Sequence, residues 1–227
     1  AAAPWIVPAL RASYRKATRA LELPFAGGFE VFPDTRRLPL VARRPTRSRA
    51  ETRAHFGIDP RGSTVLLSFG GYGLPDLDLS ALDCLRAWTV VTTDRIAAPT
   101  GALPPGVRLI PEEAFLSSGF RYEDLVAAVD VVLTKPGYGI IAECLSAGTA
   151  MLYTSRGAFR EYAVLTRELP RYVRSRFIAQ DDLLAGQWAD ALQALLAQPP
   201  APETMATDGA AHAARALTDV LGASTSG

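Results

Sequence analysis

Short β-branched runs alternate with helical stretches from residue 62 onward, and this alternation constrains the fold more than any other feature. The runs are TVLLSF, TVVTT, VRLI, VVLT and AMLY, at residues 64–69, 89–93, 107–110, 131–134 and 150–153. Strands this apolar are typical of a parallel sheet covered by helices on both faces. Right-handed crossovers then predict an α/β fold, a Rossmann-like three-layer parallel sheet.

Helical patterns fill the intervals between these runs and also precede them. The expected helices lie at residues 80–87, 122–129, 139–147, 159–167, 183–197 and 207–221. Before the first strand, the spacing predicts a helix over 4–21 and a short extended piece over 29–32. Ser48 and Glu51 have the form of a capping box that opens a further short helix ending at Gly57.

Composition excludes several classes of protein. No uncharged run approaches the roughly 18 apolar residues that a membrane-spanning helix needs, so we expect no membrane span. Cys84 and Cys144 are sixty residues apart and have neither partner spacing nor a neighbouring histidine, so we expect no metal site. Two isolated cysteines suggest a reducing compartment and therefore a cytoplasmic protein.

Charge is distributed unevenly along the chain. Residues 1–61 carry a net charge of about +7, and the remaining residues carry about −6. A basic segment can bind nucleic acid or a membrane surface. These arginines are scattered, however, without aromatic residues between them and without a nucleic-acid motif. We therefore favour a compositional or interface origin over a nucleic-acid-binding module, and expect no nucleic-acid partner.

Ligands of a parallel sheet bind at the carboxyl ends of its strands. In VDVVLTKPGYGIIAECLSAGTAMLY, a strand ends at Thr134, a Gly-Tyr-Gly turn follows, and a helix begins near Gly139. The free N–H groups and positive end of such a helix suit a diphosphate. Glu143, one turn further on, is placed to accept hydrogen bonds from two ribose hydroxyls. Alternatively, the glycines only permit a tight turn and Glu143 is a solvated helix residue.

Two other loops follow strands at the same edge. Gly70 and Gly71 permit backbone to approach a ligand closely, but the pattern is not the GxGxxG of a nicotinamide-binding domain. The loop over 154–162 offers polar side chains opposite the Gly-Tyr-Gly turn, among them Arg156, Arg160 and Glu161. The chain contains neither a GxSxG elbow nor a GxxxxGK[ST] loop, which argues against a serine hydrolase and against ATP hydrolysis.

The segment DLVAAVDVVLTKPGYGIIAECLSAGTAMLY resembles the C-terminal, donor-binding half of GT-B-fold glycosyltransferases related to the peptidoglycan N-acetylglucosaminyltransferase. KPGYGIIAE, FREY and DLLAGQW further resemble the glycosyltransferase-like region that precedes the sugar kinase domain of plant arabinose kinases. The resemblance covers roughly residues 38–221. It implies binding of a nucleoside diphosphate sugar, with UDP as the expected nucleotide, and transfer of a hexosyl group to an acceptor hydroxyl without metal or cofactor.

The resemblance also implies roles for individual residues. The diphosphate is expected at the turn and the Gly-Gly pair, the ribose at the helix carboxylate, the base at the segment before residue 122, and the sugar at the loop after the fifth strand. The expected donor-binding residues are Gly70, Gly71, Phe120, Lys135, Gly137, Tyr138, Gly139, Glu143, Arg160 and Glu161. No catalytic residue is assigned, because any base is expected on the other half of a GT-B enzyme.

The resemblance also predicts how the chain is organised. Residues 1–37 are expected to be a remnant of the N-terminal acceptor half, 38–61 a linker and first helix, 62–222 the nucleotide-sugar domain, and 223–227 a disordered tail. The N-terminal acceptor domain itself is expected to be missing, so we expect the chain alone to be inactive. Glu161 and Tyr162 replace a glutamine pair of the peptidoglycan enzymes. A non-catalytic sugar-nucleotide sensor or interaction domain, within a larger protein that contains a sugar kinase, is therefore the alternative.

Overall fold

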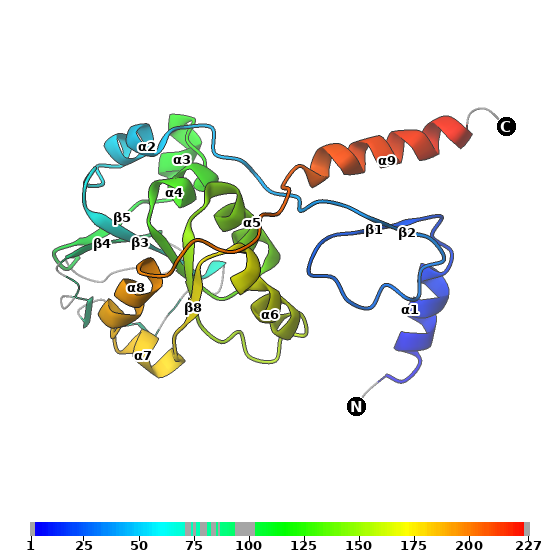
Figure 1. The fold of residues 1–227 in the computed structure, drawn as a ribbon, viewed down its shortest axis with the longest axis horizontal. Helices are drawn as coiled ribbons and strands as arrows, with labels where there is room; N and C mark the ends of the chain where they lie inside the picture. Colours follow the sequence, from blue (N-terminus) through cyan, green and yellow to red (C-terminus); the bar gives the residue numbers. More distant parts are fainter. Residues whose placement is uncertain are drawn as a thin grey trace. The chain divides into compact units, whose positions relative to one another are not determined.

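The computed structural model describes residues 3–70, 74, 76–77, 81–82, 85, 87–93 and 103–224. The chain divides into two compact units (Figure 1). The larger unit is Arg43–Thr204, and the smaller combines Ala1–Ala42 with Met205–Gly227. The larger unit begins before the predicted domain start at residue 62, because the helix over 49–55 packs on the helix over 122–128.

A six-stranded parallel sheet forms the centre of the larger unit, which confirms the predicted fold class. Its strand order is β5-β4-β3-β6-β7-β8. The strands are β3 Ser63–Ser68, β4 Trp88–Thr92, β5 Val107–Leu109, β6 Val131–Thr134, β7 Ala150–Tyr153 and β8 Ser175–Phe177. The first five correspond to the predicted strands within one residue at each end. The sequence analysis missed β8, because this edge strand has only three residues and is largely exposed.

Helices cover both faces of the sheet. They are α2 Arg49–His55, α3 Glu113–Ser118, α4 Tyr122–Ala128, α5 Tyr138–Ala147, α6 Tyr162–Tyr172, α7 Gln180–Leu184 and α8 Ala189–Leu196. Helices α2, α4, α5 and α6 contact one another in series, and α8 contacts β7 and β8. The resulting layers are visible in Figure 1. The predicted helix over 80–87 lies partly outside the described residues.

The core follows from the alternation of side chains along each strand. Val65, Leu67 and Leu133 lie in one cluster with the fully buried Trp188 and Leu192 of the α7–α8 region. The residues that point to the opposite face of the sheet are also buried; they include Leu66 of β3, Val132 of β6 and Met151 of β7. Burial on both faces explains why these strands read as continuous apolar runs.

The predicted helix over 183–197 is two helices in the structure. Gly186 lies between α7 and α8 with a φ of +70°. A Cβ atom at this position would lie 2.8 Å from the Ala81 carbonyl oxygen. The chain therefore turns here at a glycine that has both the required backbone freedom and the required small size.

The smaller unit contains α1 Ile6–Tyr14, β1 Ala20–Glu22, β2 Thr35–Arg37 and α9 Gly209–Ser224. The predicted helix over 4–21 is too long, because residues 20–22 instead pair in parallel with residues 35–37. The extended piece predicted over 29–32 is wrong as well, because the strand begins only at Thr35. An antiparallel bridge between Val41 and Asp208 joins the two segments of this unit. No described helix is both long and apolar enough to span a bilayer.

Candidate functional site

The carboxyl ends of β3, β6 and β7 lie side by side in the sheet. The Thr134 hydroxyl, at the end of β6, donates to the Ser68 carbonyl at the end of β3. The Thr154 N–H, just after β7, donates to the Thr134 carbonyl at 3.1 Å. The three loops in which the sequence analysis placed a ligand therefore start from neighbouring points.

Helix α5 begins directly after the β6 loop, with Gly137 as its N-cap. As a glycine, Gly137 has no side chain with which to cap this end. The first-turn N–H groups of a helix lack carbonyl partners within the helix and carry the positive end of its dipole. This end of α5 therefore offers hydrogen-bond donors and partial positive charge at the edge where the sheet's ligands are expected.

Arg156, from the loop after β7, reaches the start of α5. Its Nη1 donates to the Pro136 carbonyl at 2.7 Å, and its guanidinium lies 3.9 Å from the centre of the Phe159 ring. A Cβ atom at Gly137 would collide with the Arg156 Nη1. Because the φ of Gly137 is −158°, which any residue adopts, the glycine provides space for the arginine in its present position and is not required by the turn. The Arg156 guanidinium therefore lies at the N-terminal end of α5 and adds a cation there.

The other predicted residues near this turn differ in their surroundings. Lys135 is half-buried directly after β6, and Gly139 is exposed on the first turn of α5. Tyr138 is half-buried. Its burial raises the pKa of its hydroxyl, and the nearby Glu161 carboxylate raises it further. Glu161 is exposed at the N-cap of α6, so the β6 and β7 loops face each other here. Arg160 is exposed.

Glu143 is neither solvated nor accessible. Its side chain is 5% exposed, and Arg43 Nη2 donates to its Oε1. Arg43 also lies 3.7 Å from the Oε2 atom of Glu123, a second carboxylate with 5% exposure. Burial raises the pKa of Glu143, and Arg43 opposes this only in part. The interpretation of Glu143 as a solvated helix residue is therefore wrong, and its carboxylate already has a cationic partner.

Two further predicted residues, Phe120 and Gly70, lie on other elements. The Phe120 ring stacks on His55 with 4.2 Å between the ring centres and an angle of 13°. The guanidinium of Arg47 lies 5.4 Å from the same ring. Gly70 follows β3 with a φ of +64°, in the left-handed region that favours glycine. Gly71 lies outside the described residues.

Two site features were missed from the sequence. Arg43 is one of many arginines in a proline-punctuated segment, and no motif distinguishes it. Asp124 is fully buried and holds that segment in place, because its carboxylate accepts the N–H groups of Arg47 at 2.9 Å and Thr46 at 2.5 Å. Only the tertiary fold brings these residues to α4 and α5.

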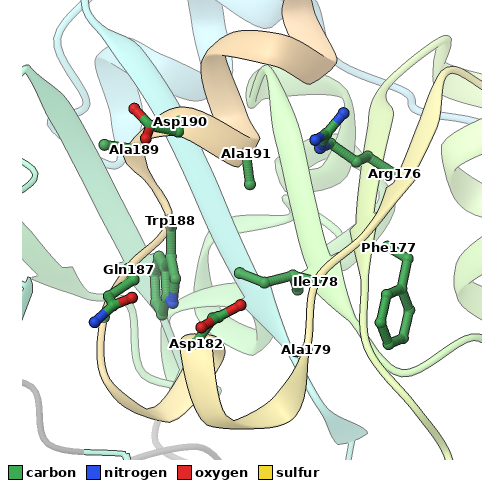
Figure 2. Close-up of a pocket in the computed structure, with 11 residues that line it drawn as sticks. Arg176, Phe177, Ile178, Ala179, Asp182, Gln187, Trp188, Ala189, Asp190 and Ala191 are labelled. Carbon is green, nitrogen blue, oxygen red and sulfur yellow. The ribbon is translucent and has the colours of Figure 1, made fainter.

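A cavity of about 670 Å³ lies beside the end of β8 (Figure 2). Phe177, Ile178 and Trp188 contribute apolar surface, and Arg176 and Asp182 contribute charge. None of the predicted donor-binding residues in the described part of the chain lines it. The cavity therefore belongs to the edge of the sheet and not to the three loops described above.

Comparisons with known proteins concern the sequence and the fold. No protein-family model matches the chain. An L-arabinokinase from Arabidopsis thaliana is 30% identical over 183 residues, which are 81% of this chain and 17% of that protein. The chain thus spans about a sixth of the length of this curated relative. The crystal structure of the glycotransferase of kitacinnamycin matches with a TM-score of 0.56 at 17% identity, over 81% of this chain and 48% of that chain.

These comparisons concern most of the chain. The sequence match supports the predicted resemblance to the plant arabinose kinases. The structural match, at low identity, shows the fold. The chain therefore has the Rossmann-like fold of one half of a GT-B glycosyltransferase and is similar in sequence to part of a plant L-arabinokinase.

Proposed function

We propose that this chain binds the nucleoside diphosphate of a sugar donor and is the donor-binding half of a glycosyltransferase-like protein. The observation that carries the proposal is the meeting of the α5 N-terminus, whose N-cap is a glycine, with the Arg156 guanidinium at Gly137. A diphosphate is the ligand class that this combination of backbone donors, helix dipole and guanidinium suits best.

Each part of the ligand then has a neighbour in this region. The diphosphate lies on the Gly137–Gly139 turn, with Arg156 and Lys135 balancing its charge. Glu143 lies five residues beyond Tyr138, about 8 Å along the helix axis, and accepts the ribose hydroxyls. The base lies toward Phe120, and the sugar toward Arg160 and Glu161. UDP is the nucleotide that we propose.

In the complete protein, a second domain would present an acceptor hydroxyl to the sugar. The bond between the anomeric carbon and the diphosphate breaks, and the acceptor oxygen forms a new bond to that carbon. The proton of the acceptor hydroxyl passes to a base on the second domain. The donors at the start of α5 and the Arg156 guanidinium stabilise the charge on the departing diphosphate, which is electrostatic catalysis without a metal. That second domain, and the cytoplasmic location predicted above, are part of the proposal.

Calorimetry with UDP, GDP and UDP-sugars tests the binding step. Arg156→Met should weaken UDP binding about tenfold or more, because it removes a charge-assisted hydrogen-bond donor. Arg167→Met is the matched control, because Arg167 is 71% exposed on α6 and pairs only with neighbouring Glu168 among the ion pairs of the described residues. Glu143→Ala should also weaken binding. Absence of heat at millimolar concentrations of every nucleotide would remove the proposal.

A non-catalytic role is the second candidate. It is favoured by Glu161 and Tyr162 at the positions of a glutamine pair, and by similarity to a sixth of an L-arabinokinase. In that case the domain senses a sugar nucleotide for a longer protein that contains a sugar kinase. Retained UDP-sugar binding by the full-length protein, without transfer or hydrolysis of the sugar, would support this candidate. Measured transfer to an acceptor would contradict it.

A further inference from the structure

Arg43 covers the carboxylate that the proposed function assigns to the ribose. Its guanidinium contacts both Glu143 and Glu123. The two carboxylates are each 5% exposed, whereas the Arg43 side chain is 63% exposed. The arginine therefore lies on the outside of the cluster, between the buried acids and the solvent. The guanidinium therefore occupies the position from which a hydroxyl group would bond to Oε1 of Glu143.

Moving Arg43 has an electrostatic cost that depends on the ligand. Any ligand that displaces Arg43 removes a positive charge from beside two buried carboxylates, and a neutral nucleoside also leaves the guanidinium without an anion. Buried charges without partners are strongly unfavourable. A ligand that carries phosphate groups gives the displaced guanidinium a new anion, and guanidinium–phosphate pairs are among the strong charge-assisted contacts.

The Arg43 side chain is largely exposed, and the backbone that follows it is anchored. The backbone three and four residues further along is fixed, because the N–H groups of Thr46 and Arg47 donate to the buried Asp124 carboxylate. Arg121 lies 3.8 Å from Glu123 and is itself 63% exposed. When Arg43 leaves, Glu123 thus keeps one cation and Glu143 becomes available.

We propose that Arg43 exchanges from Glu143 to an anionic group of the incoming ligand, and that this exchange makes the site select nucleoside phosphates over neutral nucleosides. The inference rests on the proposed function and adds a specificity-determining residue to it. Arg43 is then a sensor of the phosphate group, and Glu143 is the group that it releases.

The test compares uridine with UDP on the unaltered chain, Arg43→Met and Arg44→Met. UDP binding is measured by calorimetry, and uridine binding by displacement of bound UDP, so that weak affinities are still quantified. The quantity compared is the dissociation constant of uridine divided by that of UDP. In Arg43→Met this ratio should fall at least about tenfold, because uridine no longer competes with the guanidinium and UDP loses an ionic partner. Arg44 is the exposed neighbour of Arg43, and its variant should keep the original ratio.

Arg43→Lys is the second variant, for use if Arg43→Met does not fold by circular dichroism. A lysine keeps the charge but lacks the planar fork that contacts both carboxylates, so the ratio should fall by a smaller factor, about threefold. A ratio within twofold of the unaltered value in the folded variant, or uridine that fails to displace UDP from it at tens of millimolar, would overturn the inference. If UDP binds and Glu143→Ala weakens it while the ratio is unchanged, the inference fails and the proposed function stands. If UDP does not bind at all, both fail.

Discussion

Replacing Arg53 with methionine removes a charged side chain that is only 2% exposed. Its Nε donates to the Ala128 carbonyl at 2.7 Å, and its Nη1 donates to the carbonyls of Asp59 and Gly62 at 2.7 and 2.9 Å. Its Nη2 donates to Asp130 at 3.1 Å. One side chain thus ties α2 to the turn after it and to the segment between α4 and β6.

The magnitude follows from the acceptors left behind. A buried acceptor without a partner costs about 1–3 kcal/mol. Ala128 is fully buried, so its carbonyl should cost an amount in the upper part of that range. Asp59 and Gly62 are reachable by water, so their carbonyls should cost amounts in the lower part. Asp130 keeps Arg49 and the Thr64 N–H. The sum is a loss of about 3–5 kcal/mol, which is a large share of the roughly 5–15 kcal/mol that stabilises a typical domain.

Urea unfolding followed by circular dichroism and by tryptophan fluorescence measures this loss, provided that the two transitions coincide. Arg49→Met is the matched control. The Arg49 side chain is 42% exposed and bonds to the Val129 carbonyl and to Asp130, so its removal should cost only about 0.5–1 kcal/mol. A loss below about 1 kcal/mol for Arg53→Met, or one no greater than that of the control, would refute the reasoning.

Three further predictions concern other buried groups. Burial raises the pKa of Asp124, but the N–H donors of Arg121, Arg47 and Thr46 outweigh burial and lower the pKa below its usual value. The stability lost in Asp124→Asn should therefore be largest at neutral pH and should shrink as the pH falls below about 4. Urea unfolding at pH 7 and at pH 3 measures this difference. Burial is the larger cause of the raised pKa of the Cys144 thiol, and the Glu143 charge adds to it. In a Cys84→Ser background, a thiol reagent should therefore label Cys144 only when the protein unfolds. Labelling within minutes in native buffer would contradict this prediction. Gly148 ends α5 at a φ of +71°, and an added Cβ would have no atom of the described residues within 4 Å apart from its chain neighbours. Gly148→Ala should therefore cost about 1 kcal/mol from backbone strain alone, and a loss of several kcal/mol in urea would show an unforeseen clash.

The sheet and the α5 turn were predictable because their signals are local. Buried parallel strands are continuous apolar runs, and the position of Gly137 marks where the chain leaves β6 for α5. The helix over 4–21 was overestimated for the opposite reason. Helical spacing continues past Tyr14, but residues 20–22 find strand partners at residues 35–37 that no local pattern reveals.

The charge asymmetry became interpretable only in three dimensions. Arginines of the basic segment pair with carboxylates of the acidic remainder, as Arg43 does with Glu143 and Arg49 and Arg53 do with Asp130. A part of the basic surplus is therefore internal to the larger unit and is not offered to a polyanion. The sequence shows the sum of charges on each segment but not which charges meet, so it does not reveal that the carboxylate of Glu143 pairs with Arg43.

The short ladder at residues 40–41 and 206–209 has a mechanical consequence. The Leu40 N–H donates to the Ala206 carbonyl at 3.0 Å, and the Gly209 N–H donates to the Leu40 carbonyl at 3.1 Å. The whole of the larger unit, Arg43–Thr204, is the loop that this ladder closes. Tension applied through the outer segments is therefore borne first by a few backbone hydrogen bonds, and the sheet is loaded only after they break. In a longer polypeptide, such a clasp would let neighbouring parts pull on the chain without deforming the proposed nucleotide site.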